Sequence, residues 1–183
     1  RSGGHGFCGC GRRELLLILQ DRCRALGVDL QFESEIAGIA QLAEADLIVG
    51  ADGINSVIRA ELAEHFRPHA ADRANRFLWM GTTKPYPAFT FDFTTDAHGI
   101  WVLGAYQYSH DMSTWVVEAP PRTWASAEAE LGRLDEPALI AHMERLWADQ
   151  LDGHRLIGNR TTWRTFPMIR NQRWWHDNVV LLG

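Results

Sequence analysis

Hydrophobic periodicity in the first third of the chain predicts alternating helices and strands. Residues 12–26 carry apolar side chains at helical spacing, and Gly27 is placed to end that helix. Residues 28–32 alternate apolar and polar side chains, as a half-buried strand does. The segment 46–49, DLIV, is typical of a parallel strand covered on both faces, and residues 57–66 predict a further helix.

The middle of the chain has a different pattern, which predicts an antiparallel sheet. Aromatic-rich or β-branched runs alternate there with short turn-like segments, and they cover residues 77–83, 89–94, 99–108 and 113–118. Apolar spacing over 136–151 predicts a helix. Residues 161–168 predict another strand of the sheet, and residues 178–182 predict a strand that returns to the first part of the chain.

Composition excludes several classes of partner. With 183 residues, 46% of them hydrophobic and 22% charged, the chain is an ordinary globular protein with room for one domain and part of another. The net charge of −5 argues against nucleic acid as the main partner. No run approaches the ~18 apolar residues of a membrane helix, and no signal peptide is visible. We therefore expect no nucleic-acid partner and no membrane partner.

Cysteine usage indicates a reducing compartment and a cytoplasmic location. The 3 cysteines cannot all pair within the chain. Cys8 and Cys10 lie near His5, but the usual metal-site spacing and a fourth ligand are missing, so we expect loop packing and no metal. Cys23 falls within a helical pattern and is expected in the core.

Both ends of the chain are abrupt. It opens at Arg1 without a methionine, and it closes on a strand pattern that reaches Gly183. Because such a strand pairs with neighbours and continues into further structure, we expect the chain to be a piece of a longer protein.

The segment 45–59, ADLIVGADGINSVIR, is the most specific chemical signal. Gly53 and the small residues around it leave Asp52 on a turn whose backbone a ligand can approach closely. Ser56, or the asparagine before it, can cap the following helix, and Arg59 lies one turn further on. A strand end, an acidic turn and a helix start together suit the sugar and phosphates of a nucleotide cofactor. An ordinary strand–turn–helix corner is the alternative.

This segment resembles the second fingerprint of the class A flavoprotein monooxygenases, the para-hydroxybenzoate hydroxylase family. In that family an apolar strand leads to Asp-Gly, a small residue, Ser and Arg, and the turn is linked to FAD and nicotinamide binding. The resemblance implies a mixed α/β fold, in which a Rossmann-like FAD-binding part is interrupted by an antiparallel β-sheet substrate domain. It divides the chain into 1–68, part of the FAD-binding domain, 69–170, the substrate sheet, and 171–183, the return strand.

Further stretches extend the resemblance to the rest of the cofactor site. The segment from Gly11 to Leu19 is similar to the family's Arg-x-x-Leu-x-x-x-Leu element, whose arginine reaches the flavin nucleotide; solvated surface arginines are the alternative. The closing glycine matches the start of the family's third fingerprint. The first fingerprint and the aspartate of the third lie outside the chain, so we do not expect this segment alone to hold FAD tightly or to be active. The implied cofactor-binding residues are Arg12, Arg13, Asp52, Gly53, Arg59 and Gly183.

Within the family, residues 2–7, 75–82 and 105–118 look like the branch that hydroxylates salicylyl-CoA and 2-aminobenzoyl-CoA. The implied reaction is the hydroxylation of an aromatic ring, carried by an aryl-CoA thioester. NADH or NADPH would reduce FAD, and O₂ would then form a flavin C4a-hydroperoxide that delivers oxygen to the ring.

The resemblance also assigns the substrate residues. The predicted sheet would form the pocket wall, with aromatic side chains suited to a flat ring, namely Trp79, Trp101, Tyr106 and Tyr108. Each of them could instead be a core residue. His5, in a glycine-rich loop, is the candidate catalytic residue that would deprotonate or orient the ring substituent. A loop histidine bonded to backbone is the alternative.

Other functions stay open on the sequence alone. One is a tryptophan-type or other small-aromatic hydroxylase of the same fold, and another is a flavin-dependent reductase that transfers no oxygen. A third is a truncated, non-catalytic product that keeps the sheet as a binding module. The expected partners are a small aromatic substrate and O₂, while the apolar face of the sheet could serve a homodimer as easily as a pocket.

Overall fold

The computed structural model describes residues 7–182. They divide into two compact units, each of which is built from separate stretches of the chain. Unit 1 contains the residues up to Val28 together with Ala74–Phe166, and unit 2 contains Asp29–Arg73 together with the residues from Pro167 onward. Two strands, β2 (Pro68–Thr82) and β7 (Arg164–Asn171), begin in one unit and end in the other.

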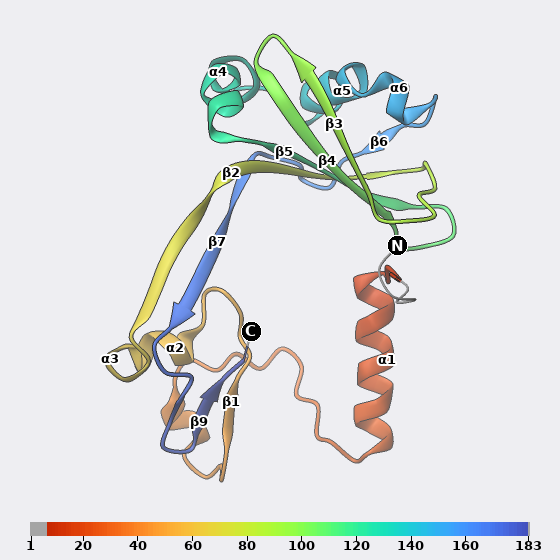
Figure 1. The fold of residues 1–183 in the computed structure, drawn as a ribbon. Helices are drawn as coiled ribbons and strands as arrows, with labels where there is room; N and C mark the ends of the chain where they lie inside the picture. Colours follow the sequence, from red (N-terminus) through yellow and green to blue (C-terminus); the bar gives the residue numbers. More distant parts are fainter. Residues whose placement is uncertain (1–6, 183) are drawn as a thin grey trace. The chain divides into compact units, whose positions relative to one another are not determined.

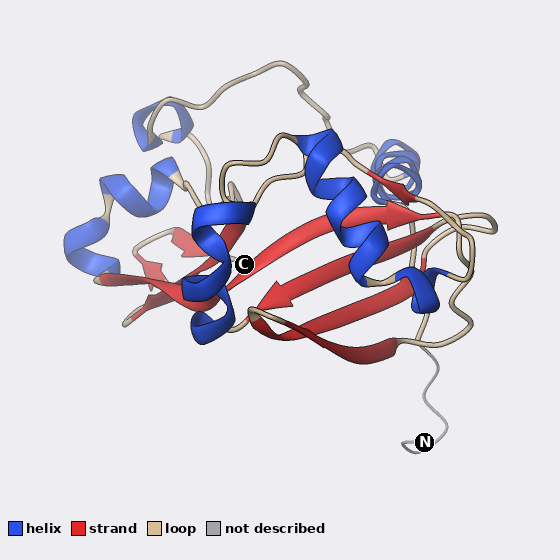
Figure 2. Ribbon diagram, turned by 90° about the horizontal axis from the view of Figure 1, so that it is seen from above, coloured by secondary structure: helices blue, strands red, loops and turns tan. Residues whose placement is uncertain are grey.

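Unit 1 is built on an antiparallel sheet. Its strand order is β3-β4-β5-β2-β6, and β7 also pairs with β2. Besides β2 and β7 the strands are β3 (Thr90–Asp96), β4 (Gly99–Gln107), β5 (Ser113–Ala119) and β6 (Leu156–Ile157). The helices α4 (Pro121–Leu131), α5 (Glu136–Leu146) and α6 (Ala148–Leu151) lie across one face of this sheet, as both ribbon views show (Figure 1, Figure 2). Helix α1 (Arg12–Ala25) has no buried residue.

The two faces of the sheet differ because side chains alternate along each strand. On the helix-covered face, Trp115 lies opposite Ala105 and Val117 lies opposite Leu103, and all of these are completely buried. The other face, called the open face below, carries the alternate residues, among them the exposed Phe91. The core of unit 1 therefore lies between the sheet and its helices.

Unit 2 is smaller and contains a three-stranded sheet in the order β1-β9-β8. Strand β1 (Ile48–Gly50) pairs in parallel with β9 (Val179–Leu181), which pairs antiparallel with β8 (Trp175–His176). The helical segments are η1 (Ile39–Leu42), α2 (Val57–Glu61) and α3 (Ala63–Phe66). Its core consists of Ile48, Ile58, Phe66, Val179 and Leu181.

Much of the predicted pattern is confirmed. The first helix, the antiparallel strands of the middle region and the strand near residue 165 all form, and the last predicted strand pairs with the 48–50 strand. Gly27 follows the first helix with a φ of +73°, which suits a helix end. The mixed α/β class, with an antiparallel sheet inserted between two parts of a smaller unit, is therefore correct. The described residues up to Val28 belong to unit 1, which contains the antiparallel sheet, whereas the sequence grouped them with residues 29–68. The assignment of cofactor and substrate domains stays a prediction.

Several local predictions are wrong. Residues 28–32 form no strand, because no neighbouring strand pairs with them among the described residues. The predicted helix 57–66 is broken at Leu62, and the predicted helix 136–151 is broken at Trp147. Helix α4 was not predicted at all. The strand at 48–50 is covered on one face only, with Val49 exposed. Cys23 is half-buried rather than in the core.

Within residues 7–182, no helix is long and apolar enough to cross a membrane. The same residues contain no group of His, Cys, Asp and Glu side chains that could hold a metal ion.

Candidate functional site

The turn after β1 is held together by its own side chains. Ser56 caps α2, because its Oγ accepts a hydrogen bond from the backbone N–H of Arg59 at 2.9 Å. The Oδ2 of Asp52 accepts one from the N–H of Val57 at 2.8 Å and a longer one from Ile58 at 3.4 Å. The N–H groups at the start of α2 are therefore satisfied within the segment.

The side chain of Arg59 folds back onto the same turn. Its Nη1 donates to the carbonyl oxygen of Gly53 at 3.2 Å, and its Nη2 donates to that of Ile54. Two residues that the sequence predicted as cofactor ligands, Asp52 and Arg59, are thus occupied in shaping the backbone around Gly53. Both side chains hold the backbone of this turn, and their predicted part in cofactor binding stays a prediction.

Hydrogen bonds also set the charge of the turn. Burial alone would raise the pKa of Asp52, but hydrogen bonds from Ser56 and from backbone N–H groups, those of Ile58 and Val57 included, outweigh it and hold the pKa below its usual value. The carboxylate is therefore ionised near neutral pH. A negative charge at the start of α2 is favourable, because the helix dipole is positive there.

Gly53 leaves the backbone open beside a small pocket. Its φ is +83°, a left-handed conformation that favours glycine, and no atom lies within 4 Å of the place where a Cβ would be. The pocket has a volume of about 330 Å³ and lies entirely within unit 2. Besides the turn, its wall includes Met168, Ile169, Asn171 and Trp174. Such a mixed apolar and polar lining is typical of a ligand site.

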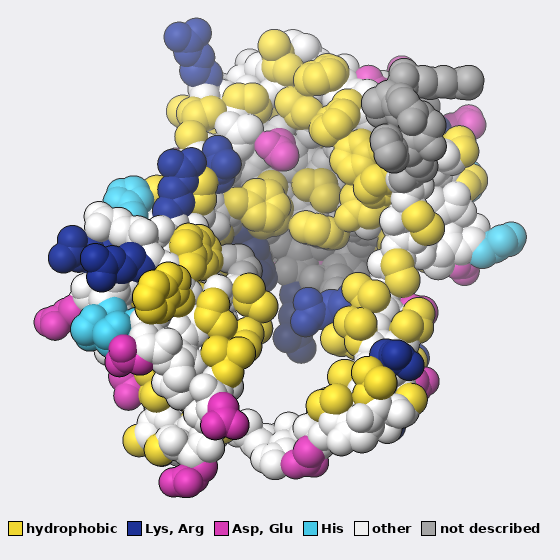
Figure 3. All heavy atoms as spheres, turned by 60° about the horizontal axis from the view of Figure 1, so that its bottom comes forward, with side chains coloured by type: hydrophobic (Ala, Val, Ile, Leu, Met, Phe, Trp, Pro, Cys, Tyr) yellow, Lys and Arg dark blue, Asp and Glu magenta, His cyan; other side chains and the backbone are white. Residues whose placement is uncertain are grey.

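The open face of the unit 1 sheet is rich in exposed aromatic side chains. Phe91 lies opposite Gly104, which lies opposite Val116, which in turn lies opposite Trp79. The exposed fractions of Phe91 and Trp79 are 66% and 49%, so both rings are available to another molecule. In the space-filling view, hydrophobic side chains gather over this side of the molecule (Figure 3).

An aromatic cluster stands at one end of this face. Phe89 stacks on Tyr106 with ring centroids 5.3 Å apart, and Phe7 meets these two rings edge-on at 5.2 and 5.3 Å. The chain just after Phe7 is pressed against β4, because a Cβ at Gly9 would lie 2.2 Å from the carbonyl oxygen of Gln107. Only a glycine fits there, so the packing of this segment fixes Phe7 in the cluster.

The structure separates the predicted substrate residues. Trp79 and Tyr106 lie on the open face, and Tyr108 is half-buried just beyond the end of β4. Trp101 is completely buried on the helix-covered face, where its ring lies 5.9 Å from that of Trp163. The prediction that Trp101 lines a substrate pocket is therefore wrong. It is a core residue, as the alternation along β4 requires.

The chain is similar in sequence to three monooxygenases of known activity. The chain is 37% identical over 190 aligned residues to a salicyloyl-CoA 5-hydroxylase of Streptomyces, and 34% identical over 185 to the protodeoxyviolaceinate monooxygenase of Chromobacterium violaceum. Both alignments span the whole chain. A third relative, from Streptosporangium sibiricum, is a 3-hydroxy-4-methyl-anthranilyl-[aryl-carrier protein] 5-monooxygenase at 35% identity over 94% of the chain. The chain is therefore similar, over nearly its whole length, to a part of each of these three monooxygenases.

Its extent relative to these monooxygenases is limited. The chain spans 37%, 49% and 44% of the length of the three relatives. No family model matches it.

Solved structures agree on the fold. A 2-methyl-3-hydroxypyridine-5-carboxylic acid oxygenase superposes with a TM-score of 0.70 at 17% identity, over 95% of this chain and 50% of the oxygenase. A flavin-dependent halogenase superposes with a TM-score of 0.63 at 14% identity, over 95% of this chain and 34% of the halogenase. The mixed α/β fold with its antiparallel sheet is therefore that of flavin-dependent oxygenases.

The residues of unit 2 have the chemistry to hold part of an FAD, the cofactor that the sequence predicts. The open side of Gly53 admits a ligand to the backbone, and the apolar wall suits a planar ring. Asn171 also lines the pocket, and its Oδ1 is buried without a hydrogen-bond partner among the described residues. A buried acceptor of this kind favours a ligand that brings hydroxyl or N–H donors, as FAD does.

The other predicted flavin-monooxygenase residues are less constrained by the structure. Arg12 and Arg13 are both exposed on α1 and make no side-chain hydrogen bond or ion pair within residues 7–182. His5 and Gly183 lie outside the described residues. The roles given to these four residues stay predictions.

Sequence reasoning missed several residues of both sites. Asn171 and Trp174 had no motif around them, because only the pairing of β9 with β1 brings their segment back to the Gly53 turn. Phe91 and Phe93 did carry a signal. They alternate with polar residues on one strand, which places them on one face of a sheet.

Proposed function

We propose that the protein containing this chain is an FAD- and NAD(P)H-dependent monooxygenase that hydroxylates an aromatic ring. The observation that supports this most is the 37% identity over the whole chain to a relative named for hydroxylation of salicyloyl-CoA. The Gly53 turn beside its pocket and the aromatic open face are features that such a reaction needs. Three free cysteines fit a reducing, cytoplasmic setting.

The cofactor would rest in part on unit 2. The backbone at Gly53 and the Asn171 amide would hold it, while Asp52 and Arg59 keep the turn in shape. Bound FAD would supply the redox chemistry: it would pass two electrons from a reduced nicotinamide to O₂, so that one oxygen atom enters the ring and the other leaves as water.

The substrate ring would rest on the open face of unit 1. Trp79 and Tyr106 from the predicted set lie there, and Phe91 and Phe89 extend the surface. Flat, apolar side chains orient an aromatic ring through stacking and edge contacts and exclude water from it. His5 would act on the ring substituent, as the sequence predicts.

The substrate class that we propose is an aryl thioester, first of all an aryl-CoA such as salicylyl-CoA or 2-aminobenzoyl-CoA. One relative is named for a CoA thioester and another for an anthranilyl group on an aryl-carrier protein. These names share an aromatic acid activated through its carboxyl group. The name of the protodeoxyviolaceinate monooxygenase contains no thioester. The second candidate function is therefore a small-aromatic hydroxylase of the same fold.

The test is a product assay with the full-length protein, FAD, NADH or NADPH and air. Salicylyl-CoA and 2-aminobenzoyl-CoA are compared with the free acids and with tryptophan, and ¹⁸O₂ labels the new hydroxyl group. We expect labelled product from a CoA thioester and at least tenfold less from its free acid. Product from tryptophan or from a free acid alone would select the small-aromatic hydroxylase.

Two other outcomes would overturn the proposal. Nicotinamide oxidation without a labelled product would make the protein a reductase. Failure of the full-length protein to retain FAD would leave the sheet as a binding module.

A further inference from the structure

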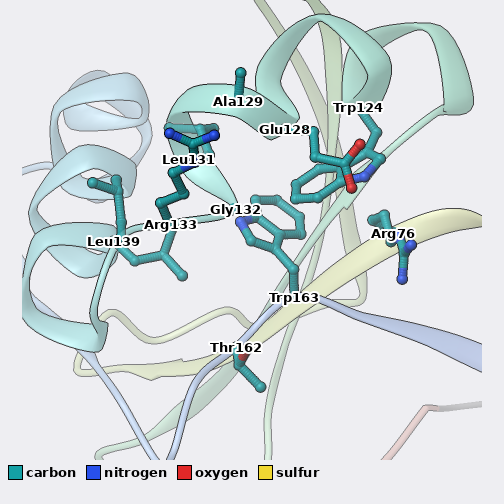
Figure 4. A pocket seen from close by; sticks show the side chains of 11 residues that line it. Arg76, Trp124, Glu128, Ala129, Leu131, Gly132, Arg133, Leu139, Thr162 and Trp163 are labelled. Carbon is teal, nitrogen blue, oxygen red and sulfur yellow. The ribbon is translucent and has the colours of Figure 1, made fainter.

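A second cavity lies beneath the C-terminal end of α4, within unit 1. Its volume is about 360 Å³, inside the range of roughly 300–1,000 Å³ that is usual for small-molecule sites. Figure 4 shows Trp163 beneath the last turn of α4, with Arg133 and Leu139 to one side and Trp124, Glu128 and Arg76 to the other. The proposed function uses none of these residues.

Two tryptophans that line this cavity carry buried hydrogen-bond donors without a partner in the described part of the chain. The indole Nε1 atoms of Trp124 and Trp163 are both buried, and neither donates to any described residue. The two rings contact each other, with centroids 4.9 Å apart and planes at 52°. Leaving a buried donor unsatisfied is unfavourable, so a molecule that brings an acceptor to it would bind more tightly. The indoles of Trp101, Trp115 and Trp147 also lack partners, but they do not line the cavity.

The charged side chains around the cavity favour an anion. Arg76 and Arg133 line it, against a single carboxylate from Glu128. The Arg76 guanidinium lies 5.7 Å from the centroid of the Trp124 ring. Within the described residues, neither guanidinium makes a side-chain hydrogen bond or an ion pair. Arginine and indole N–H groups together match the oxygens of a carboxylate.

The rest of the lining is apolar. Leu131, Leu134 and Leu139 contribute aliphatic surface next to the two indole rings. An aromatic ring would bury its faces against these groups, while a carboxyl group on that ring reached the donors. The negative charge of Glu128 would repel the carboxylate from the Trp124 side and favour the Trp163 and Arg133 side.

We propose that this cavity is a binding site for a small aromatic carboxylate, an acid of the benzoate class, distinct from the proposed reaction surface. The carboxylate accepts from the Trp163 Nε1 and from Arg133, and the ring packs against the leucines. The inference rests on the cavity alone, so it stands or falls independently of the hydroxylation assay.

The test is a titration of the full-length protein with benzoate, followed by the indole N–H signals in ¹H–¹⁵N spectra. The two resonances are assigned with the Trp124→Phe and Trp163→Phe variants. We expect the Trp163 signal to shift most, in a saturable way, and the Trp124 signal to follow it. Benzyl alcohol, which has the same ring without the charge, is expected to bind at least tenfold more weakly.

Matched variants separate the site from general effects. We expect Arg133→Gln to weaken benzoate binding about tenfold and Glu128→Gln to tighten it at least twofold. Arg122→Gln, at an exposed position of α4 that does not line the cavity, is expected to leave it unchanged. The inference is overturned if neither indole signal shifts, if benzyl alcohol binds as well as benzoate, or if Arg133→Gln binds like the unaltered protein. The other indole signals report whether each variant is folded.

Discussion

At the scale of single residues, the polar groups of the turn bond mainly to one another. Asp52 and Arg59 were predicted to face a cofactor, yet both bind backbone groups of their own segment. A cofactor would then meet the backbone that they hold in place. Such an arrangement is preorganised, because the polar partners are fixed before any ligand arrives.

Replacing Asp52 with Asn keeps an oxygen that can accept from the N–H groups of α2 but removes the negative charge. It should therefore lower the free energy of unfolding of unit 2 by about 0.3–1 kcal/mol at pH 7, the usual value of a charge at a helix start. The pKa of Asp52 is lowered in the folded state, so its contribution to stability is complete above the ordinary pKa of 3.8 that it has in the unfolded chain. The contribution is lost as the pH falls through the lowered pKa. Urea unfolding at pH 7 and at pH 3 would measure the loss of stability in the variant and its dependence on pH. The exposed Asp46→Asn is the control, and an Asp52→Asn deficit that is unchanged at pH 3 would contradict the prediction.

His142 should make the stability of unit 1 depend on pH at a higher range. Burial lowers its pKa, Arg145 and His98 lower it further, and Glu130 and Asp96 raise it in part. The stability of unit 1 is therefore highest above the ordinary histidine pKa of 6.5, and it declines as the pH falls from there towards the lowered pKa of His142. His142→Gln should flatten the dependence of the urea midpoint between pH 7.5 and 5.5. The exposed His110→Gln should leave that dependence as it is.

At the scale of helices and strands, side-chain alternation assigns each position of the sheet to one face. Trp101 and Trp79 are the same residue type on neighbouring parts of one sheet, yet the exposed fraction of the first is 0% and that of the second is 49%. One belongs to the core and the other to a surface. Substituting the buried tryptophan should therefore lower stability, whereas substituting the exposed one should weaken ligand binding.

Trp101→Ala should reduce the free energy of unfolding by about 3–5 kcal/mol, because it leaves a large cavity in the core. Trp79→Ala should change it by less than about 1 kcal/mol, as exposed substitutions usually do, while binding of the aromatic substrate is weakened. Urea unfolding of the two variants gives the comparison. Equal destabilisation would mean that the two faces are assigned wrongly.

The same alternation explains how much of the fold the sequence could predict. The four strands of the middle region were found because β-branched and aromatic residues recur between turn signals. The face of Trp101 was not found, since the run WVLGAY is apolar on both sides of the strand and has no polar positions to mark the open face. Helix α4 begins at Pro120-Pro121, which looks like a helix breaker, although proline is tolerated in the first turn.

Parts of the candidate sites depend on contacts that no local pattern contains. Residues 28–32 alternate well, but a strand also needs a partner, and none pairs with them in the described part of the chain. The Gly53 turn and its Ser56 cap were predicted from spacing alone. The pocket wall at Asn171 and Trp174 comes from a segment more than a hundred residues away in sequence.

At the scale of the whole molecule, the two units have cores of very different size. Unit 1 buries 16 residues in one cluster, whereas the cluster in unit 2 has 5. Hydrophobic stabilisation grows with the apolar area that is buried, so unit 2 should open at a lower cost in free energy. The turn that would hold a cofactor therefore belongs to the less stable unit.

Amide hydrogen exchange should show this difference directly. We expect the amides of β1 and β9 to exchange faster than those of β4 and β5 under the same conditions. Ile58→Ala should increase the exchange rates of the β1 and β9 amides and leave those of β4 and β5 unchanged. Leu103→Ala is the matched change in the larger core. Equal exchange rates for both strand pairs would indicate a single cooperative unit.

The edge strand of the unit 1 sheet carries a charge that opposes aggregation. Strand β3 ends the sheet at one side. Its exposed Phe91 and Phe93 lie on an edge whose backbone groups pair with no other strand within residues 7–182, and this combination favours self-assembly into intermolecular sheets. Asp92 lies between these two residues in the sequence, and its Oδ1 accepts the N–H of Phe93 at 2.7 Å, so one donor of the exposed edge is already taken. The alternation along β3 places Asp92 on the covered side. Burial, together with this carboxylate, raises the pKa of Tyr86 there to about 12. A second copy that docked on this edge would have to desolvate that charge, which costs several kcal/mol. The aromatic surface can thus stay exposed for a ligand, while the charge of Asp92 opposes the pairing of β3 with a strand of another molecule.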